Sequence, residues 1–266
     1  MSRFPDVGTT LYRGSYVSTD QLPWHYIPVW LTVSSPLMYS FFFVAGLFFG
    51  IKRSFLPSGS WDRNKRDTLI IFIWFFAPIA AVVAFRSVLY DGWRQAFFIY
   101  PAFLLIALTG LKNILEITEH NPYRWIRTGL AILVAIEILW IAGWMVRHHP
   151  YQNVYFNSLA GKNMADIKEK YEMDYWGLSY RKALEYILAH DQGTEIKVFV
   201  ANSPGTSNAY ILPKEERARL VFVKQPQEAG YFVSNYRWHK EDYPLPNKVF
   251  TVEIDGASIM VVHKLM

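Results

Sequence analysis

The sequence contains no cysteine, so neither a disulfide framework nor a thiolate metal site is available to it. Its basic residues do not gather into a stripe interleaved with aromatic side chains, which argues against a nucleic-acid-binding protein. Residues Met1 to Asp20 lack the basic start, short apolar run and small-residue cleavage site of a secretory signal peptide. Phosphate-loop and nucleophile-elbow patterns are also missing, and no cofactor is predicted.

Apolar residues, by contrast, are in excess. They make up 52% of the chain, and aromatic residues make up 17%, more than one soluble core normally needs. Because they lie almost wholly before residue 147, the mean hydropathy of +0.09 averages two unlike halves. The formal net charge of +5 fits a membrane protein with basic loops.

Four segments in the first half are predicted to cross a membrane as helices. The first, Pro28 to Ile51, carries no charge and is long enough at the helical rise to span a hydrocarbon core of about 30 Å. Three of the segments contain a proline, which lipid tolerates where neighbouring helices satisfy the freed carbonyl groups. The helices are therefore expected to pack as a bundle. The predicted spans are residues 28–51, 68–85, 96–115 and 128–146.

The connecting loops predict the orientation of these spans. Lys and Arg are frequent between the first and second spans and between the third and fourth, which favours a cytoplasmic position for both loops. Residues 1–27 are then predicted to form an outer loop. The short connection 86–95 and the whole of 147–266 are predicted to lie on the same outer side.

After residue 147 the pattern becomes that of a soluble domain. Leu178 to His190 has a helical period, and Glu195 to Ala201 is typical of a strand. Asp255-Gly256 is a hairpin-turn signal between two apolar segments. The predicted fold class is a membrane α-helical bundle followed by a small soluble α/β domain. The further strand candidates are residues 219–223, 231–236, 248–254 and 257–263.

The segment Tyr90-Asp91-Gly92-Trp93-Arg94-Gln95 is the first candidate binding site. A planar guanidinium presents donors suited to phosphate, so Arg94 with its neighbours can hold an anionic lipid headgroup. The alternative is that Arg94 pairs with Asp91 while Trp93 anchors the helix end at the membrane surface.

His148, His149 and Tyr151 form the second candidate. Adjacent side chains seldom point the same way, and no third ligand stands at a recognisable spacing, so no metal is predicted. Contact with a headgroup or acceptor and a plain polar helix terminus are both open interpretations. Glu137, in the middle of the fourth span, needs a partner in protein or water, either as a structural hydrogen-bonding group or as a substrate contact.

Four segments, taken together, carry a family resemblance. They are PWHYIPVWLTVSSPL (Pro23 to Leu37), YDGWRQAFFIYP (Tyr90 to Pro101), RHHPYQNVYFNSLAG (Arg147 to Gly161) and MDYWGLSYRKALEYI (Met173 to Ile187). Their order and spacing resemble the C-terminal half of bacterial protein-mannosyltransferase-like enzymes. These enzymes form the dolichyl-phosphate-mannose-protein mannosyltransferase family of the glycosyltransferase-C superfamily. The remainder of the chain is placed only as a domain attached to such enzymes.

The resemblance implies a multi-span enzyme of the bacterial inner (cytoplasmic) membrane. Such an enzyme takes a sugar from a polyprenyl-phosphate carrier and transfers it to an acceptor on the outer, periplasmic side, as in protein glycosylation. In the family the catalytic acidic residue lies in the first outer loop. The leading loop here, with Asp6 and Asp20, resembles a later loop, so no catalytic residue is assigned. The resemblance carries over, as lipid-phosphate or acceptor contacts, Tyr90, Asp91, Trp93, Arg94, His148, His149 and Tyr151.

Two functions from different classes follow. The first is inverting glycosyl transfer by a complete enzyme whose general base lies outside this chain, in a missing N-terminal half or a partner membrane subunit. Its partners are the lipid-linked sugar and membrane lipid. The second is a non-catalytic membrane subunit whose outer α/β domain binds a glycan or a partner protein. A small transporter is not favoured, because paired broken helices and an inverted repeat are missing from the sequence.

Overall fold

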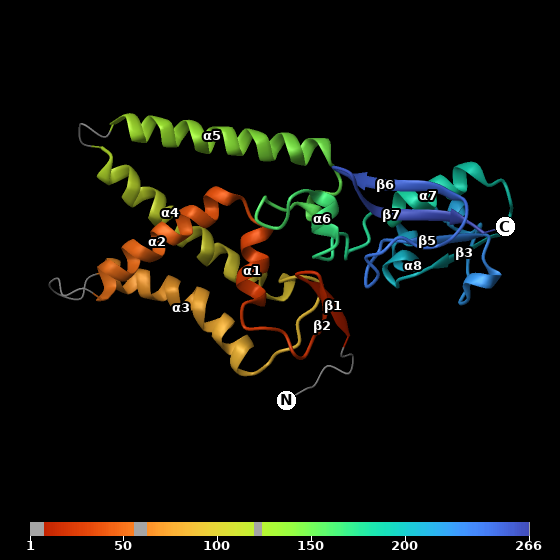
Figure 1. The fold of residues 1–266 in the computed structure, drawn as a ribbon, viewed down its shortest axis with the longest axis horizontal. Helices are drawn as coiled ribbons and strands as arrows, with labels where there is room; N and C mark the ends of the chain where they lie inside the picture. The colour runs from red at the N-terminus through yellow and green to blue at the C-terminus, as the bar shows by residue number, and fades with distance from the viewer. Residues whose placement is uncertain (1–7, 56–62, 120–123, 266) are drawn as a thin grey trace. The chain divides into compact units, whose positions relative to one another are not determined.

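The computed structural model describes residues 8–55, 63–119 and 124–265. The chain divides into two compact units, and each is described by itself (Figure 1). The first comprises Met1–Gly8 and Ser18–Arg147 and is called the helical unit. The second comprises Thr9–Val17 and His148–Met266 and is called the sheet unit.

Long apolar helices dominate the helical unit. Within the described residues, four helices are long and apolar enough to cross a membrane: Leu37–Ser54, Arg63–Ala84, Arg94–Ile117 and Trp125–Arg147. This confirms the four apolar helices expected from the sequence, by length and composition. The helices are α1 (Tyr26–Val33), α2 (Leu37–Phe55), α3 (Arg63–Ala84), the 3-10 helix η1 (Arg94–Ile99), α4 (Tyr100–Ile117) and α5 (Arg124–Arg147).

The apolar run expected as one helix over residues 28–51 is instead two helices. The chain leaves the helical path between α1 and α2, at Ser34-Ser35-Pro36. Pro36 has no N–H to continue the helical ladder, and a residue that precedes a proline is disfavoured in the α conformation. The Ser34 hydroxyl donates to the Trp30 carbonyl at 2.6 Å, which satisfies one group at the end of α1.

Glu137 of α5 satisfies a backbone group at the start of α2. The Met38 amide donates to both carboxylate oxygens of Glu137, each at 3.2 Å. Because α2 begins at Leu37, this amide is one of the donors that have no partner inside the helix. Glu137 therefore has the structural hydrogen-bonding partner that its position in an apolar helix requires.

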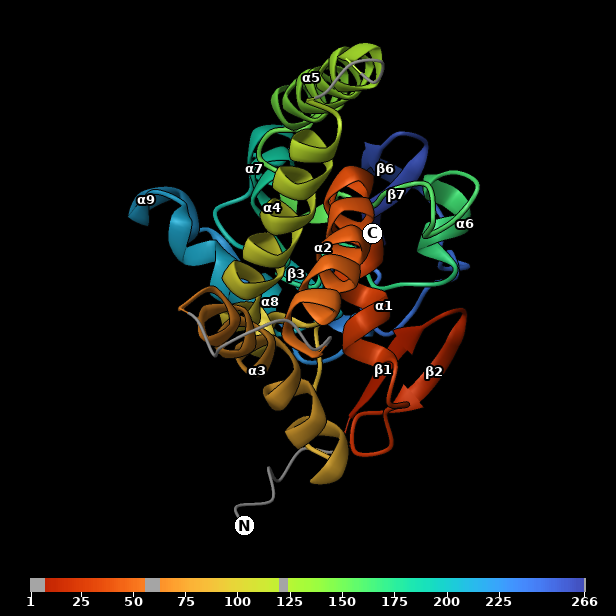
Figure 2. The same cartoon turned by 90° about the vertical axis from the view of Figure 1, so that its left-hand side faces the viewer.

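Two glycines bring α2 and α4 into close contact, and the two helices lie side by side (Figure 2). A Cβ atom added at Gly46 would lie 1.9 Å from the Ile106 carbonyl oxygen, and one added at Gly110 would lie 2.1 Å from the Phe42 carbonyl oxygen. Only glycine leaves room for backbones this close, as at the small-residue contacts of membrane helices. The two glycines therefore set the spacing of the helices.

Many large apolar side chains of α3 and α5 are exposed, a pattern typical of membrane-spanning helices. Phe75 is the buried residue of α3, and it packs against Phe43 at a ring-centroid distance of 4.9 Å. Phe43 in turn lies 4.8 Å from Phe103 of α4. The aromatic contacts thus join α3 to the α2–α4 pair.

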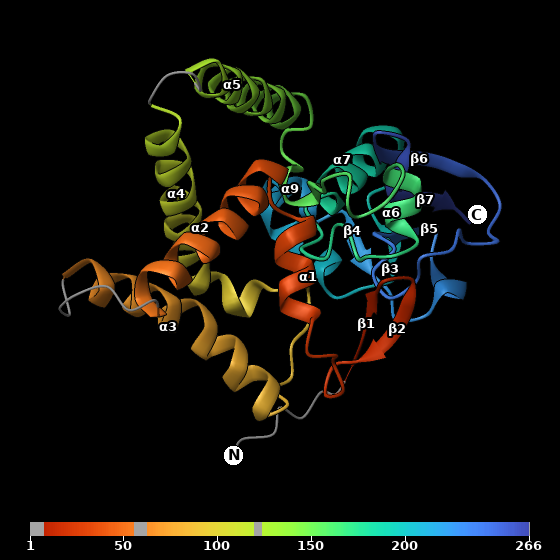
Figure 3. The ribbon, with the colours of Figure 1, turned by 60° about the vertical axis from the view of Figure 1, so that its left-hand side comes forward.

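The sheet unit has a mixed sheet in the order β4-β3-β5-β7-β6 (Figure 3). β3 pairs in parallel with β4 and β5, whereas β7 pairs antiparallel with β5 and β6. The long helix α7 buries Leu184 and Ile187 and contacts β5, β6 and β7. The bounds are α7 (Tyr180–His190), β3 (Ile196–Val200), β4 (Leu220–Phe222), β5 (Tyr231–Ser234), β6 (Lys248–Ile254) and β7 (Ala257–Lys264).

These elements lie where the sequence predicts them, because each has a local signal. The β6–β7 turn is Asp255-Gly256, whose φ angles of 45° and 84° are those of the hairpin turn that such a pair favours. The shorter elements are η2 (Gln152–Val154), α6 (Met164–Lys168), α8 (Pro204–Asn208), η3 (Ala209–Ile211), α9 (Lys214–Arg217) and η4 (Pro226–Glu228).

The segment expected as a plain outer loop over residues 1–27 contains a hairpin of strands β1 (Thr9–Tyr12) and β2 (Ser15–Ser18). Its residues Thr9–Val17 belong to the sheet unit. Tyr12 forms a β-bridge with Tyr171, and the Gly14 amide donates to the Lys170 carbonyl at 3.1 Å. Local sequence patterns do not predict this pairing, because its partners lie far apart in the chain.

Replacing Gly110 by Ala should weaken the α2–α4 contact, because the new methyl group meets a carbonyl oxygen of the facing helix. Such overpacking typically lowers the free energy of unfolding by about 1–3 kcal/mol. Gly143→Ala is the matched control, since a Cβ there meets nothing within 4 Å. Thermal unfolding in detergent, followed by circular dichroism, should show a lower midpoint for Gly110→Ala alone. Equal midpoints for the two variants would contradict the proposed packing.

Candidate functional site

The turn that precedes η1 holds the first group of candidate residues. Asp91 and Gly92 both have left-handed backbone angles, with φ of 57° and 70°. A Cβ on Gly92 would lie 3.6 Å from the ring of Trp30, so the turn runs close against α1. The indole N–H of Trp93 donates to the Ser34 hydroxyl oxygen at 2.9 Å. The turn is thus fixed to the break between α1 and α2.

The same turn brings Tyr90, Asp91 and Arg94 together. The Arg94 Nη2 atom lies 3.2 Å from Asp91 Oδ2, and the guanidinium carbon lies 4.6 Å from the centroid of the Tyr90 ring. The Asp91 side chain is 5% exposed and that of Arg94 is 24% exposed. The ion pair that the sequence allows is therefore formed, and it holds the guanidinium in one orientation at the surface.

In the sheet unit, the histidines and the tyrosine of the second candidate group have different partners. His148 is buried with its Nε2 atom 3.1 Å from Asp255 Oδ1, whereas His149 is exposed and its Nδ1 atom lies 2.9 Å from the Gln152 amide nitrogen. Tyr151 is buried, and burial is the main factor that raises the pKa of its hydroxyl to about 12. These side chains do not converge on one point. Across residues 8–55, 63–119 and 124–265, no group of three or more His, Asp or Glu side chains is placed to hold a metal ion.

The sheet unit also contains a buried carboxylate that sequence reasoning missed. Asp174 lies in the loop before α7 and is 2% exposed. One of its oxygens accepts from the Ser179 amide at 2.9 Å and from the Ser179 hydroxyl at 2.5 Å. The other accepts from the Leu178 amide at 3.1 Å and from the Asn153 side chain at 3.3 Å. Burial raises the pKa of the Asp174 carboxyl, and the four donors oppose that rise.

Asn235 connects this loop to the sheet. Its side-chain N–H donates to the Asp174 carbonyl at 2.8 Å, and its side-chain oxygen accepts from Asn202 at 2.8 Å and from the Tyr180 hydroxyl at 3.4 Å. Asn202 and Asn235 follow the parallel strands β3 and β5, whose carboxyl ends meet at one edge of the sheet. That edge is where open α/β sheets commonly bind ligands.

The chain after Asn235 has a strained backbone. Tyr236 and Trp238 have φ angles of 60° and 61°, a left-handed conformation that is uncommon for bulky residues. The ammonium of Lys168 lies 3.4 Å from the centroid of the Tyr236 ring, and the Tyr236 hydroxyl donates to Asp242 at 2.9 Å. Strain of this kind clusters at ligand sites, where the surrounding contacts hold it in place.

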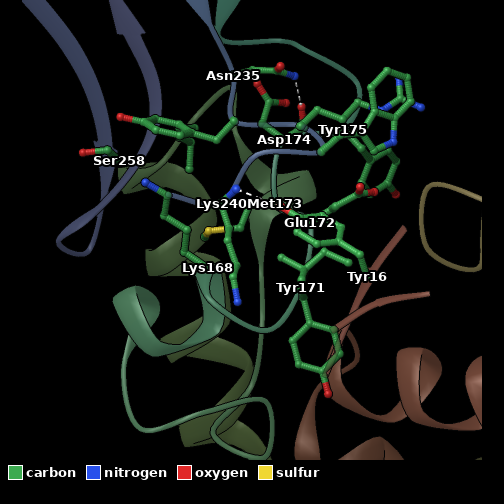
Figure 4. Close-up of a pocket in the computed structure, with 15 residues that line it drawn as sticks. Tyr16, Lys168, Tyr171, Glu172, Met173, Asp174, Tyr175, Asn235, Lys240 and Ser258 are labelled. Atoms are coloured by element: carbon green, nitrogen blue, oxygen red, sulfur yellow. Dashed lines mark hydrogen bonds between the residues drawn. The ribbon is translucent and has the colours of Figure 1, made fainter. Parts of the chain in front are cut away.

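These residues enclose the aromatic pocket, named here for its tyrosine and tryptophan lining. The cavity has a volume of about 20 Å³, room for roughly one water molecule. Figure 4 shows Asp174 and Asn235 joined by a hydrogen bond, with Lys168 and Lys240 on the lining. The pocket is lined by Leu11, Tyr16, Lys168, Tyr171–Tyr175, Asn235–Trp238, Lys240, Ser258 and Ile259. The segment 173–187 is one of the four that carry the family resemblance, but only the fold brings it together with Asn235.

Comparison of the chain with family models, with curated proteins and with solved structures finds no match in any of the three.

Replacing Asp174 by Asn should destabilise the sheet unit. Asparagine keeps one acceptor oxygen but puts an NH₂ group where the carboxylate accepts from two donors, at a cost of about 1–3 kcal/mol for buried groups left unpaired. Hydrogen exchange in the full chain should show correspondingly weaker protection of the α7 amides. Asp191→Asn is the control, because the Asp191 carboxylate accepts from the Gly193 amide in an exposed turn. Unchanged α7 protection in Asp174→Asn would contradict the role given to this network.

Proposed function

We propose that the chain is the C-terminal portion of a membrane glycosyltransferase that transfers a sugar from a polyprenyl-phosphate carrier to an acceptor on the outer side of the membrane. The observation that carries the proposal is the Arg94 guanidinium, held by Asp91 and over Tyr90 at the start of a helix long enough to cross a membrane. The family resemblance of four segments supports the same function.

The four apolar helices are the proposed membrane spans. The basic loops on one side then put the turn Tyr90–Arg94 at the outer surface, at the depth where phosphate headgroups lie. Asp91 fixes the direction of the guanidinium, and Tyr90 covers one of its faces. An arginine held in this way presents its planar donors to phosphate without a further loss of side-chain freedom.

The proposed reaction is an inverting displacement at the sugar carbon that is bonded to the carrier phosphate. The acceptor oxygen forms the new bond to that carbon and gives its proton to a carboxylate base, which in this proposal lies outside the chain. The bond from carbon to the phosphate oxygen breaks, and its electron pair leaves with the polyprenyl phosphate. Arg94 stabilises the charge that develops on this leaving phosphate.

The second candidate group takes a smaller part in this proposal. His148 and Tyr151 are buried, so their contribution is to hold the start of the sheet unit. His149 is the exposed member of the three and is the one positioned to contact an acceptor.

A second candidate function is a non-catalytic membrane subunit whose outer domain binds a glycan or a partner protein. The observation that favours it is the aromatic pocket, which is built entirely from residues of the sheet unit. Binding there requires no catalytic acid from elsewhere.

Sugar transfer from a radiolabelled polyprenyl-phosphate sugar distinguishes the two functions. Membranes that contain this chain should be assayed alone and together with the product of the adjacent upstream gene. Transfer that requires this chain supports the glycosyltransferase. Absence of transfer under both conditions, with the chain stably expressed, would contradict it and favour the binding subunit.

The exchange Arg94→Lys tests the phosphate contact in the transferring assembly. Lysine keeps a positive charge beside the buried Asp91 carboxylate, but it lacks the planar fork of donors. The value of kcat/KM for the lipid-linked donor should fall on the order of tenfold, as expected for one lost charge-assisted hydrogen bond. Arg86→Lys, in the same connection between α3 and η1, is the control and should change kcat/KM little. Equal effects of the two exchanges would remove Arg94 from the site.

A further inference from the structure

A groove lies between α4 and α5 of the helical unit. Its volume is about 310 Å³, which falls within the range of small-molecule sites, about 300–1,000 Å³. Figure 1 and Figure 3 both show the two helices running apart from the end of α4. A space of this kind between two apolar helices has to be filled by a partner when the helices lie in a membrane.

The wall that α4 contributes is an apolar stripe. Leu108, Leu111 and Leu115 line the groove and are spaced at three and four residues, so they lie on one face of the helix. Leu108 is 58% exposed, and the other two leucines are partly exposed. Residues 125–147 of α5 are likewise all at least partly exposed. Exposed apolar surface of this extent suits hydrocarbon, so this part of the groove fits an acyl chain.

Charged side chains of both signs line the same groove. Lys112 and Arg127 are its cations, whereas Glu116 and Glu119 are its carboxylates. The Lys112 ammonium lies 3.7 Å from the Glu116 carboxylate, and the two side chains are 74% and 58% exposed. A pair this exposed is weak, so both members remain open to a ligand. Because two cations balance two anions, the groove favours a ligand that carries one charge of each sign.

The charges are positioned at the depth of lipid headgroups. Lys112 and Glu116 lie in the last turns of α4, Glu119 follows that helix, and Arg127 lies at the end of the first turn of α5. Both helices are long and apolar enough to cross a membrane, so these ends belong at its surface, with Leu108 deeper. The charged and apolar parts of the groove therefore follow the order of headgroup and acyl chain in a phospholipid.

A headgroup fits these charges better than a further apolar helix does. Such a helix would remove the two cations and the two carboxylates from water, which is costly for charges without matched partners. A phospholipid leaves the headgroup level hydrated and supplies a phosphate for the cations. An amine in the same headgroup matches the carboxylates.

We propose that the groove between α4 and α5 binds a zwitterionic phospholipid with a primary amine in its headgroup, of the phosphatidylethanolamine type. The phosphate contacts Arg127 and Lys112, the ammonium donates to Glu119, and the first part of one acyl chain lies along Leu108 and Leu111. An ammonium has three N–H donors for carboxylate oxygens, whereas a quaternary ammonium has none. An anionic headgroup would meet the carboxylates without a cation of its own. The site requires helices that lie in a membrane and does not depend on sugar transfer.

Lipid binding should be measured by native mass spectrometry on the full chain, purified in a neutral detergent. The probes are phosphatidylethanolamine, phosphatidylcholine and phosphatidylglycerol with the same acyl chains. Phosphatidylethanolamine should bind about three- to fivefold more tightly than the other two, the magnitude expected of exposed charge contacts. Phosphatidylcholine has the same net charge but no N–H donor, and phosphatidylglycerol is an anion, so the comparison separates hydrogen bonding from charge.

Glu119→Gln is the decisive variant, because Glu119 is exposed and glutamine keeps its length. It should remove the preference for phosphatidylethanolamine over phosphatidylcholine and should strengthen binding of phosphatidylglycerol. Arg127→Gln should weaken binding of all three lipids, since it removes a phosphate contact. The control is Arg53→Gln, because Arg53 is an exposed cation in the last turn of α2 and lies outside the groove lining. The control should bind as the unaltered chain does.

Equal binding of the three phospholipids, tighter binding of phosphatidylglycerol to the unaltered chain, or equal losses in Arg127→Gln and Arg53→Gln would each overturn the lipid site. A second polypeptide that stays bound and prevents phospholipid from binding would show that a further helix fills the groove, and would also overturn the site. Sugar transfer is measured separately. Loss of the lipid site therefore leaves the glycosyltransferase proposal in place, and loss of transfer leaves the lipid site in place.

Discussion

Polar groups that leave water must find hydrogen-bond partners, and both units of this protein are arranged around that requirement. In the helical unit, the break at Ser34–Pro36 frees backbone amides at the start of α2, and Glu137 accepts from one of them. In the sheet unit, Asp174 accepts from four donors and Asn235 joins its loop to the ends of the parallel strands. The turn Tyr90–Arg94 is joined to the break between α1 and α2 by the hydrogen bond from Trp93 to Ser34. The aromatic pocket is lined by Asp174 and Asn235.

Local patterns in the sequence predict many of the helices and strands. The features that they do not predict depend on contacts between distant segments. The period of α7 and the turn at Asp255-Gly256 are encoded by adjacent residues, and both are found. The pairing of Tyr12 with Tyr171 depends on segments far apart in the chain. The same holds for Asp174, whose place in the site depends on Asn235 in the structure. Tyr90 to Arg94 form a turn that the sequence already suggested, because all its members are neighbours.

The guanidinium of the helical unit and the carboxylate of the sheet unit differ in their accessibility. The Arg94 side chain is 24% exposed beside Asp91, so it is open to the phosphate contact that the proposed function requires. Asp174 is 2% exposed, and its oxygens accept from four protein donors. Its role is therefore to hold the loop before α7 in place.

The proposed function requires that the sheet unit lie on the outer side of a membrane that the four helices cross. Because the chain has no cysteine, single cysteines can report on sides of the membrane without background. A membrane-impermeant maleimide applied to spheroplasts should label Tyr210→Cys, at an exposed position of the sheet unit, and should leave Lys65→Cys, near the start of α3, unlabelled until the membrane is permeabilised. Labelling of Lys65→Cys in intact spheroplasts with protection of Tyr210→Cys would contradict the account.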